Sequence, residues 1–110
     1  MSRLFLGEFE QLVLLAVLRQ DGNGYGVTLR REIEERTGRR PGLGSVYTTL
    51  DRLTRKGFIE ARTLAPTEVR GGRGKKVFRL TRGGRSALIA SLERIESMAR
   101  GLTLDADGAL

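Results

Sequence analysis

The chain has 110 residues and a net charge of +7 at pH 7, with 39% hydrophobic and 30% charged residues. This length allows one domain with a modest core, and domains of this size often complete their core by dimerising. Cysteine and histidine are both missing, which excludes disulfides, thiolate metal sites and the commonest general base. The composition therefore favours a binding protein over an enzyme, with no metal and no cofactor.

The chain shows no membrane-targeting pattern. The apolar run at residues 12–18 is too short to cross a bilayer, and no small-residue cleavage site follows it. We therefore expect a cytoplasmic protein.

The positive charge is concentrated in one third of the chain. Residues 52–85 contain eleven Lys or Arg and two Glu, a net charge of +9, so the rest of the chain is slightly acidic. Charge confined to one contiguous segment is typical of a surface that binds a polyanion such as a nucleic acid.

Three helices are predicted in the first half of the chain, at residues 7–20, 25–37 and 43–56, because apolar residues recur there with helical spacing. Residues 21–24 form a strong turn signal between the first two helices, and Gly38 is placed to end the second in a left-handed cap. The second and third helices are therefore joined by a tight connection.

The third helix has one apolar stripe, formed by Val46, Leu50 and Leu53 at spacings of four and three. We expect this stripe to face the core. The outer faces are then predicted to carry hydroxyls near the start of the helix and cations near its end: Ser45, Thr48, Thr49, Arg52, Arg55 and Lys56.

A β-hairpin is predicted next, with strands at residues 58–64 and 76–80. The segment between them is rich in glycine and basic residues, which indicates a long, flexible, basic tip. Its cations are Arg70, Arg73, Lys75 and Lys76.

The last helix is predicted to begin after Thr81, a good N-cap residue, although the two glycines that follow weaken its first turn. A heptad-like row with spacings of 4, 3, 4 and 3 runs along it. The row could pack on its own domain, but a complete core leaves little to cover it, so dimerisation is favoured. The dimer contacts are predicted to come from this row and from the first helix: Leu88, Leu92, Ile95, Ala99 and Leu102 with Phe5, Phe9 and Leu12.

This order of elements predicts a mainly α fold with a small β-hairpin (α+β), a winged helix-turn-helix followed by a C-terminal dimerisation helix. The winged domain is expected at residues 5–80, the dimerisation helix at 81–102 and a flexible tail at 103–110.

In a helix-turn-helix the second helix of the pair enters the DNA major groove. Here Ser45, Thr48 and Thr49 are predicted to contact base edges, and the cations of the third helix and of the hairpin to contact phosphates. Tyr47 lies beside the apolar stripe, so it can pack in the core, contact a phosphate, or do both, because a tyrosine can bury its ring and leave its hydroxyl exposed.

Four motifs in this order resemble the PadR family of transcriptional regulators: Tyr25-Gly26, residues 45–53 (SVYTTLDRL), residues 56–60 (KGFIE) and residues 77–84 (VFRLTRGG). The resemblance implies a dimeric winged-helix repressor that binds a palindromic operator through Tyr47 and its neighbours. It also implies a last helix that packs on the partner's first helix, and release from DNA by a small-molecule effector at the dimer interface. Gly42 departs from the family, which often has a serine as N-cap of the third helix.

Other interpretations of these motifs are weaker. The basic glycine loop lacks the spacing of a nucleotide-binding loop. Glu32, Glu34 and Glu35 lie among arginines on a predicted exposed face, where ion pairs are the ordinary explanation. The remaining rival is a winged-helix module that binds a protein or RNA without operator specificity.

Overall fold

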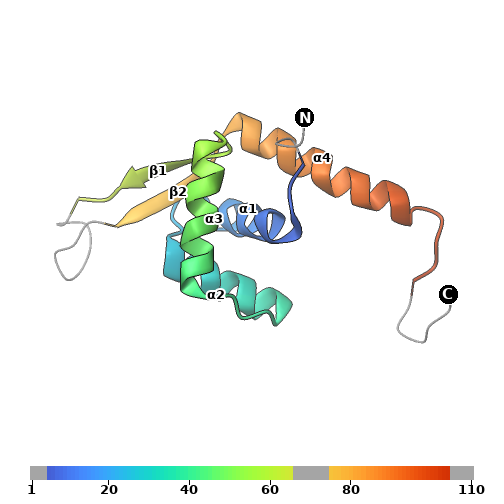
Figure 1. Ribbon diagram of the computed structural model, residues 1–110, viewed down its shortest axis with the longest axis horizontal. Helices are drawn as coiled ribbons and strands as arrows, with labels where there is room; N and C mark the ends of the chain where they lie inside the picture. The colour runs from blue at the N-terminus through green and yellow to red at the C-terminus, as the bar shows by residue number, and fades with distance from the viewer. Residues whose placement is uncertain (1–4, 66–74, 105–110) are drawn as a thin grey trace.

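The computed structural model describes residues 5–65 and 75–104, and within these residues the chain forms four helices and one two-stranded hairpin (Figure 1). This confirms the predicted fold class. The last helix ends at Ala99, three residues before the end of the predicted segment. The elements are α1 (Glu8–Arg19), α2 (Gly26–Thr37), α3 (Leu43–Arg55), β1 (Ile59–Thr63), β2 (Lys76–Leu80) and α4 (Arg82–Ala99).

The core lies where α1, α2 and α3 meet the hairpin and the start of α4. The predicted stripe on α3 is confirmed, because Val46, Leu50 and Leu53 are all buried there. Both Val13 and Leu14 are also buried, so α1 is covered on more than one side. The remaining large core side chains are Leu6, Val17, Leu29, Ile33, Phe58, Ile59, Phe78 and Leu88.

The hairpin is antiparallel and projects from one end of the molecule (Figure 1). Its register pairs Ala61 with Phe78 and Thr63 with Lys76. The Phe78 N–H also donates to the carbonyl of Gly24 at 3.0 Å, which ties β2 to the turn between α1 and α2. The hairpin therefore has a fixed place relative to the helix-turn-helix. Residues 66–74, which include Arg70 and Arg73, lie outside the described residues.

The start of α4 is anchored on the connection between α3 and β1. The Thr81 hydroxyl accepts from the Gly84 N–H at 3.0 Å, so the predicted N-cap is confirmed, and it donates to the Gly57 carbonyl at 2.6 Å. Gly84 packs so closely that an added Cβ would lie 1.9 Å from the Phe58 carbonyl oxygen. Two glycines weaken this turn in the sequence, and for one of them, Gly84, close packing is the reason.

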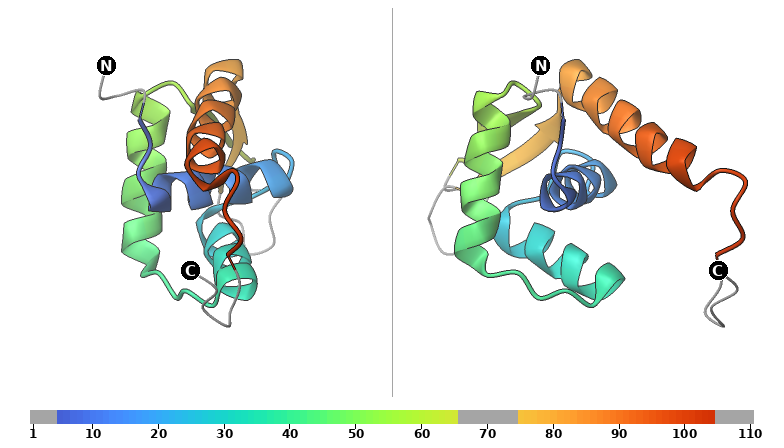
Figure 2. Two further views of the ribbon diagram at one scale, coloured as in Figure 1. Left: turned by 90° about the vertical axis from the view of Figure 1, so that its right-hand side faces the viewer. Right: turned by 45° about the vertical axis from the view of Figure 1, so that its right-hand side comes forward.

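The C-terminal half of α4 extends away from the body of the protein, as the right-hand view of Figure 2 shows. The first half covers the core through Leu88 and Ser91, both buried. Among the described residues, no helix is long and apolar enough to cross a membrane.

Candidate nucleic-acid interface

The outward face of α3 is polar. Gly44, Thr48, Asp51 and Arg55 follow one another at spacings of four, three and four and are all exposed, opposite the buried stripe. Ser45 is exposed as well. This face offers hydroxyls, one carboxylate and one cation, the groups that can read base edges and contact phosphates.

Thr49 corrects the sequence prediction, which placed it on an outer face. Its exposed fraction is only 4%. The position three residues after Val46 and four before Leu53 puts it at the edge of the buried stripe. A small β-branched side chain fits there, so Thr49 belongs to the packing of α3 and is not available to a base edge.

Tyr47 is half-buried, a place that the sequence prediction allows. Its side chain is 48% exposed, and the tip of its ring packs on the first residue of α2. A Cβ added to Gly26 would lie 2.4 Å from the ring carbon Cζ. The Tyr25-Gly26 motif and Tyr47 are therefore one packing unit, in which glycine makes room for the ring.

A groove of about 260 Å³ separates α3 from the hairpin. Tyr47, Thr48 and Asp51 line the helix side, and Lys76 lines the strand side. The Lys75 ammonium lies 4.2 Å from the centre of the Tyr25 ring, a cation–π contact at the start of α2. The predicted hairpin cations that the structure describes thus lie close to the exposed face of α3.

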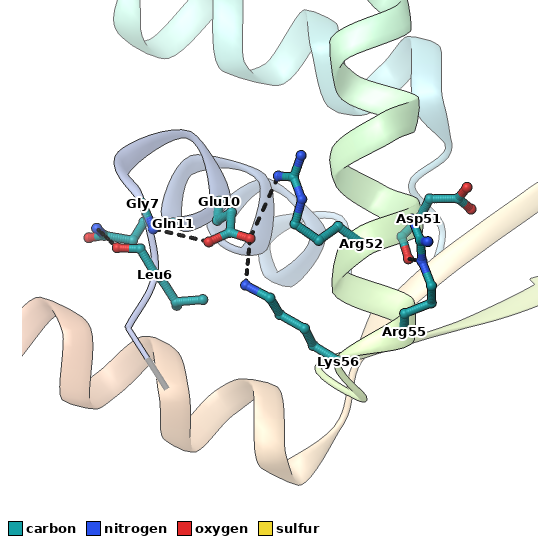
Figure 3. A network of polar contacts seen from close by, with 8 residues as sticks. All are labelled: Leu6, Gly7, Glu10, Gln11, Asp51, Arg52, Arg55 and Lys56. Carbon is teal, nitrogen blue, oxygen red and sulfur yellow. Dashed lines mark hydrogen bonds and ion pairs between the residues drawn. The ribbon is translucent and has the colours of Figure 1, made fainter. Parts of the chain in front are cut away.

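Lys56 and Arg52 lie on the other side of α3, where they point toward α1 (Figure 3). The Lys56 ammonium donates to Glu10 Oε2 at 2.8 Å, and Arg52 Nη1 lies 3.7 Å from the same oxygen. Glu10 Oε1 accepts from the Gly7 N–H at 3.0 Å. The sequence motifs point to both cations but not to Glu10, their acidic partner.

The Glu10 residue is only 8% exposed. Burial by itself raises the pKa of this carboxyl. The hydrogen bonds from Lys56 and Gly7 and the positive charges of Lys56 and Arg52 outweigh it, so the pKa lies below the ordinary value of 4.5. Glu10 is therefore ionised at neutral pH and fully partnered.

Two of the three acidic residues of α2, Glu32 and Glu34, form ion pairs. Glu32 lies 2.7 Å from Arg36 one turn away, and Glu34 lies 2.7 Å from Arg40. Hydrogen bonds from Gln20 and Arg36 lower the pKa of Glu32, and one from Arg40 lowers the pKa of Glu34. Within the part of the chain that the structure describes, no three His, Cys, Asp or Glu gather as a metal site.

Apolar side chains are exposed along the C-terminal half of α4 and just beyond it. Leu92 and Ile95 of the predicted row are exposed, Ile95 by 58%, as is Leu102. Leu88 is instead 3% exposed, because the same face of α4 covers the protein's own core at that level. Its assignment to a dimer contact is wrong in this respect. The sequence pattern missed three further exposed apolar residues here, Ile89, Met98 and Leu104.

The N-terminal residues of the predicted dimer contact differ in exposure. Phe5 is exposed, and the Arg94 guanidinium of α4 lies 4.4 Å from the centre of its ring. Phe9 and Leu12 are partly buried against the core. The segment before α1 therefore lies against α4, next to the exposed apolar row.

The family model described as Transcriptional regulator PadR-like family matches residues 14–90, from the first turns of α1 to the middle of α4. The chain belongs to the PadR-like family of transcriptional regulators. A curated relative, transcriptional regulator Rv3488 of Mycobacterium tuberculosis, is 34% identical over 80 residues, which are 73% of this chain and 70% of the relative.

Several solved structures share this fold. The hsRosR-S4 complex of H. salinarum RosR has a TM-score of 0.68 and 30% identity, and covers 93% of this chain and 78% of that chain. Bacillus subtilis PadR in complex with operator DNA has a TM-score of 0.63 and 27% identity, over 77% of this chain and 47% of that longer chain. This PadR-like chain is thus a transcriptional regulator with a winged helix-turn-helix.

Proposed function

We propose that this PadR-like protein is a cytoplasmic homodimeric repressor that binds a palindromic operator. The observation that carries the proposal is the exposed polar face of α3 beside the cations of the hairpin. The operator complex of Bacillus subtilis PadR supports it, because that relative has the same fold.

In the proposed complex α3 lies in the major groove. Ser45, Thr48 and Asp51 contact base edges, since hydroxyls serve either kind of base and a carboxylate accepts from the amino group of cytosine. Arg55 and the exposed edge of Arg52 contact phosphates. The Tyr47 hydroxyl contacts the phosphate that passes the start of α2.

The hairpin supplies the second set of proposed contacts. Lys75 and Lys76 contact the backbone on the far side of the groove between α3 and β2. Phosphate contacts are also proposed for Arg70 and Arg73, which lie outside the described residues. Neutralising several phosphates releases counterions, which supplies most of the affinity and makes it depend on salt.

The proposed dimer forms through α4. Leaving Leu92, Ile95 and Met98 in water is costly, since burying one such side chain is worth about 1.5–3 kcal/mol. A two-fold axis buries each residue twice, because both copies use the same surface. In each protomer, Phe5 with Phe9 and Leu12 behind it forms the apolar surface on which the α4 row of the other protomer packs.

We also propose that a small molecule at this dimer interface releases the repressor. A ligand shifts an equilibrium only when it binds one state better than the other. The two states here differ in the separation of the α3 helices, and the dimer interface sets that separation.

The test is selection of bound sequences from a random pool of DNA duplexes. Recovery of a palindrome with half-sites about one helical turn apart is the expected result. Recovery of no common sequence, or tighter binding to RNA than to duplex DNA at the same salt concentration, would contradict operator binding. The second outcome would favour the rival, a module that binds RNA without operator specificity.

A further inference from the structure

Glu10 is a buried carboxylate that joins the first turn of α1 to the end of α3, and the proposed DNA contacts do not use it. One oxygen accepts from Gly7 at the start of α1, and the other accepts from Lys56, the C-cap residue of α3. Glu10 and Lys56 are 46 residues apart in the sequence. The carboxylate therefore fixes the C-terminal end of α3 against α1.

The same short segment also contacts α4. Leu6 is buried in the core, and its carbonyl accepts from Gln11 Nε2 at 3.3 Å. Phe5, the residue before it, lies under Arg94 of α4. Phe5 and Leu6 thus connect a contact with α4 to Gly7, whose N–H donates to Glu10.

The cations at the end of α3 are divided between its two sides. Lys56, with a side chain 23% exposed, points to Glu10, whereas Arg55 lies on the opposite side and is exposed (Figure 3). The Arg55 Nε donates to the carbonyl of Asp51 over a long distance of 3.5 Å. An internal carboxylate thus neutralises Lys56 but leaves Arg55 free for a phosphate.

We propose that Glu10 is a positioning residue for operator recognition. It holds Lys56 away from the phosphates and fixes α3 relative to the dimer face, and so it sets the half-site spacing that the dimer accepts. The inference rests on the proposed operator binding. It assigns Lys56, which the sequence predicts to contact a phosphate, to the ion pair with Glu10.

The first arm of the test needs no DNA. The carboxyl carbon of Glu10 is titrated by NMR in the wild-type protein and in Lys56→Gln. A higher pKa in the variant is expected, because the ammonium that favours the carboxylate is gone. An unchanged pKa would show that Lys56 does not hold Glu10 in solution, and it would overturn the proposal.

The second arm measures the slope of log affinity against log salt on the selected palindrome. The slope is negative, and each phosphate contact adds about 0.9 to its magnitude, which is the quantity compared below. Lys56→Gln should leave the slope unchanged, and Glu10→Gln should raise it by about 0.9 because Lys56 is released. A slope that falls by about 0.9 in Lys56→Gln would place Lys56 on a phosphate and overturn the proposal.

The third arm compares palindromes whose half-sites are moved apart or together by one base pair. Glu10→Gln should reduce the preference for the selected spacing by roughly fivefold or more, the lower range of energetic coupling between sites. The matched control is Glu8→Gln, which removes an exposed carboxylate from the same turn and should keep the preference. A purely structural ion pair would lower stability and leave the preference intact, which would overturn the proposal.

Failure of operator binding is distinguishable from failure of the positioning role of Glu10. If the wild-type protein selects no palindrome, the proposed function is wrong, and the positioning role is wrong with it whatever the NMR titration shows. If the palindrome is found but slope and spacing preference do not follow Glu10, only the positioning role is wrong. Circular dichroism confirms that each variant is folded.

Discussion

The exposed faces of α3 and α4 present different kinds of side chain. On α3 the apolar stripe is buried and the outward row holds Thr48, Asp51 and Arg55, whereas α4 leaves Leu92 and Ile95 exposed beyond the core. A polar face is stable in water, but an exposed apolar row favours association with another apolar surface. This difference is why we assign DNA to α3 and a second protomer to α4.

The largest expected effect comes from placing a charge in the α4 row. Ile95→Glu removes an apolar contact twice in a symmetric dimer, a loss of about 3–6 kcal/mol from burial alone. We expect monomers in sedimentation at micromolar concentration and an operator affinity lower by about 100-fold or more.

The control for this variant is Ser97→Glu, which adds the same charge at an exposed polar position two residues away. It should remain dimeric. If Ile95→Glu is still a dimer with full affinity, α4 does not form the interface, and the contrast between the two helices has another cause.

The next effect concerns the joint between α3 and α4. Gly84→Ala forces a Cβ into the Phe58 carbonyl oxygen, so the unfolding free energy should fall by about 1–3 kcal/mol, as in overpacked cores. The neighbouring Gly83→Ala meets nothing closer than 3.8 Å and is the matched control. Chemical denaturation of both variants measures the difference, and equal stabilities would contradict the packing of α4 on Phe58.

A smaller effect is expected from Arg55→Ala on the α3 face. Losing one phosphate contact should reduce the salt slope of operator binding by about 0.9 without changing sequence preference. Arg100→Ala, which removes an exposed cation beyond the last turn of α4, should leave the slope unchanged. Equal slopes for all three proteins would remove Arg55 from the DNA face.

The smallest effect is the acid sensitivity that Glu10 confers. Since its pKa in the folded protein lies below 4.5, the unfolded chain binds this proton more tightly. The stabilisation is complete above pH 4.5 and is lost as the pH falls through the folded-state pKa. The difference in Tm between the wild-type protein and Glu10→Gln should therefore narrow below pH 4.5, and a constant difference would mean that Glu10 is not the titrating group.

Local patterns predicted the elements of this fold well. The apolar stripe of α3, the left-handed cap at Gly38 and the N-cap at Thr81 each depend on residues within a few positions of one another. The order of helices and hairpin then limits the topology to a winged helix-turn-helix. Such features are readable because both their cause and their effect lie in one short segment.

Contacts between distant segments were not predictable in the same way. Glu10 meets Lys56 across 46 residues, and as a sequence feature it is only an acidic residue in the first turn of a helix. Thr49 lies at the edge of a stripe, where spacing alone permits either burial or exposure. Leu88 continues the α4 row, but only the packed core shows that its own domain covers it.

The measurement that tests the central assignment most directly is the affinity for the selected palindrome as a function of salt concentration, with wild-type protein. The exposed cations of α3 and the hairpin predict a linear fall of log affinity with log salt, with a slope equal to about 0.9 for each phosphate contacted. The expected result is a slope whose magnitude corresponds to several phosphate contacts, at a stoichiometry of two protomers per duplex. An affinity that does not change with salt would contradict the assignment of this face to DNA.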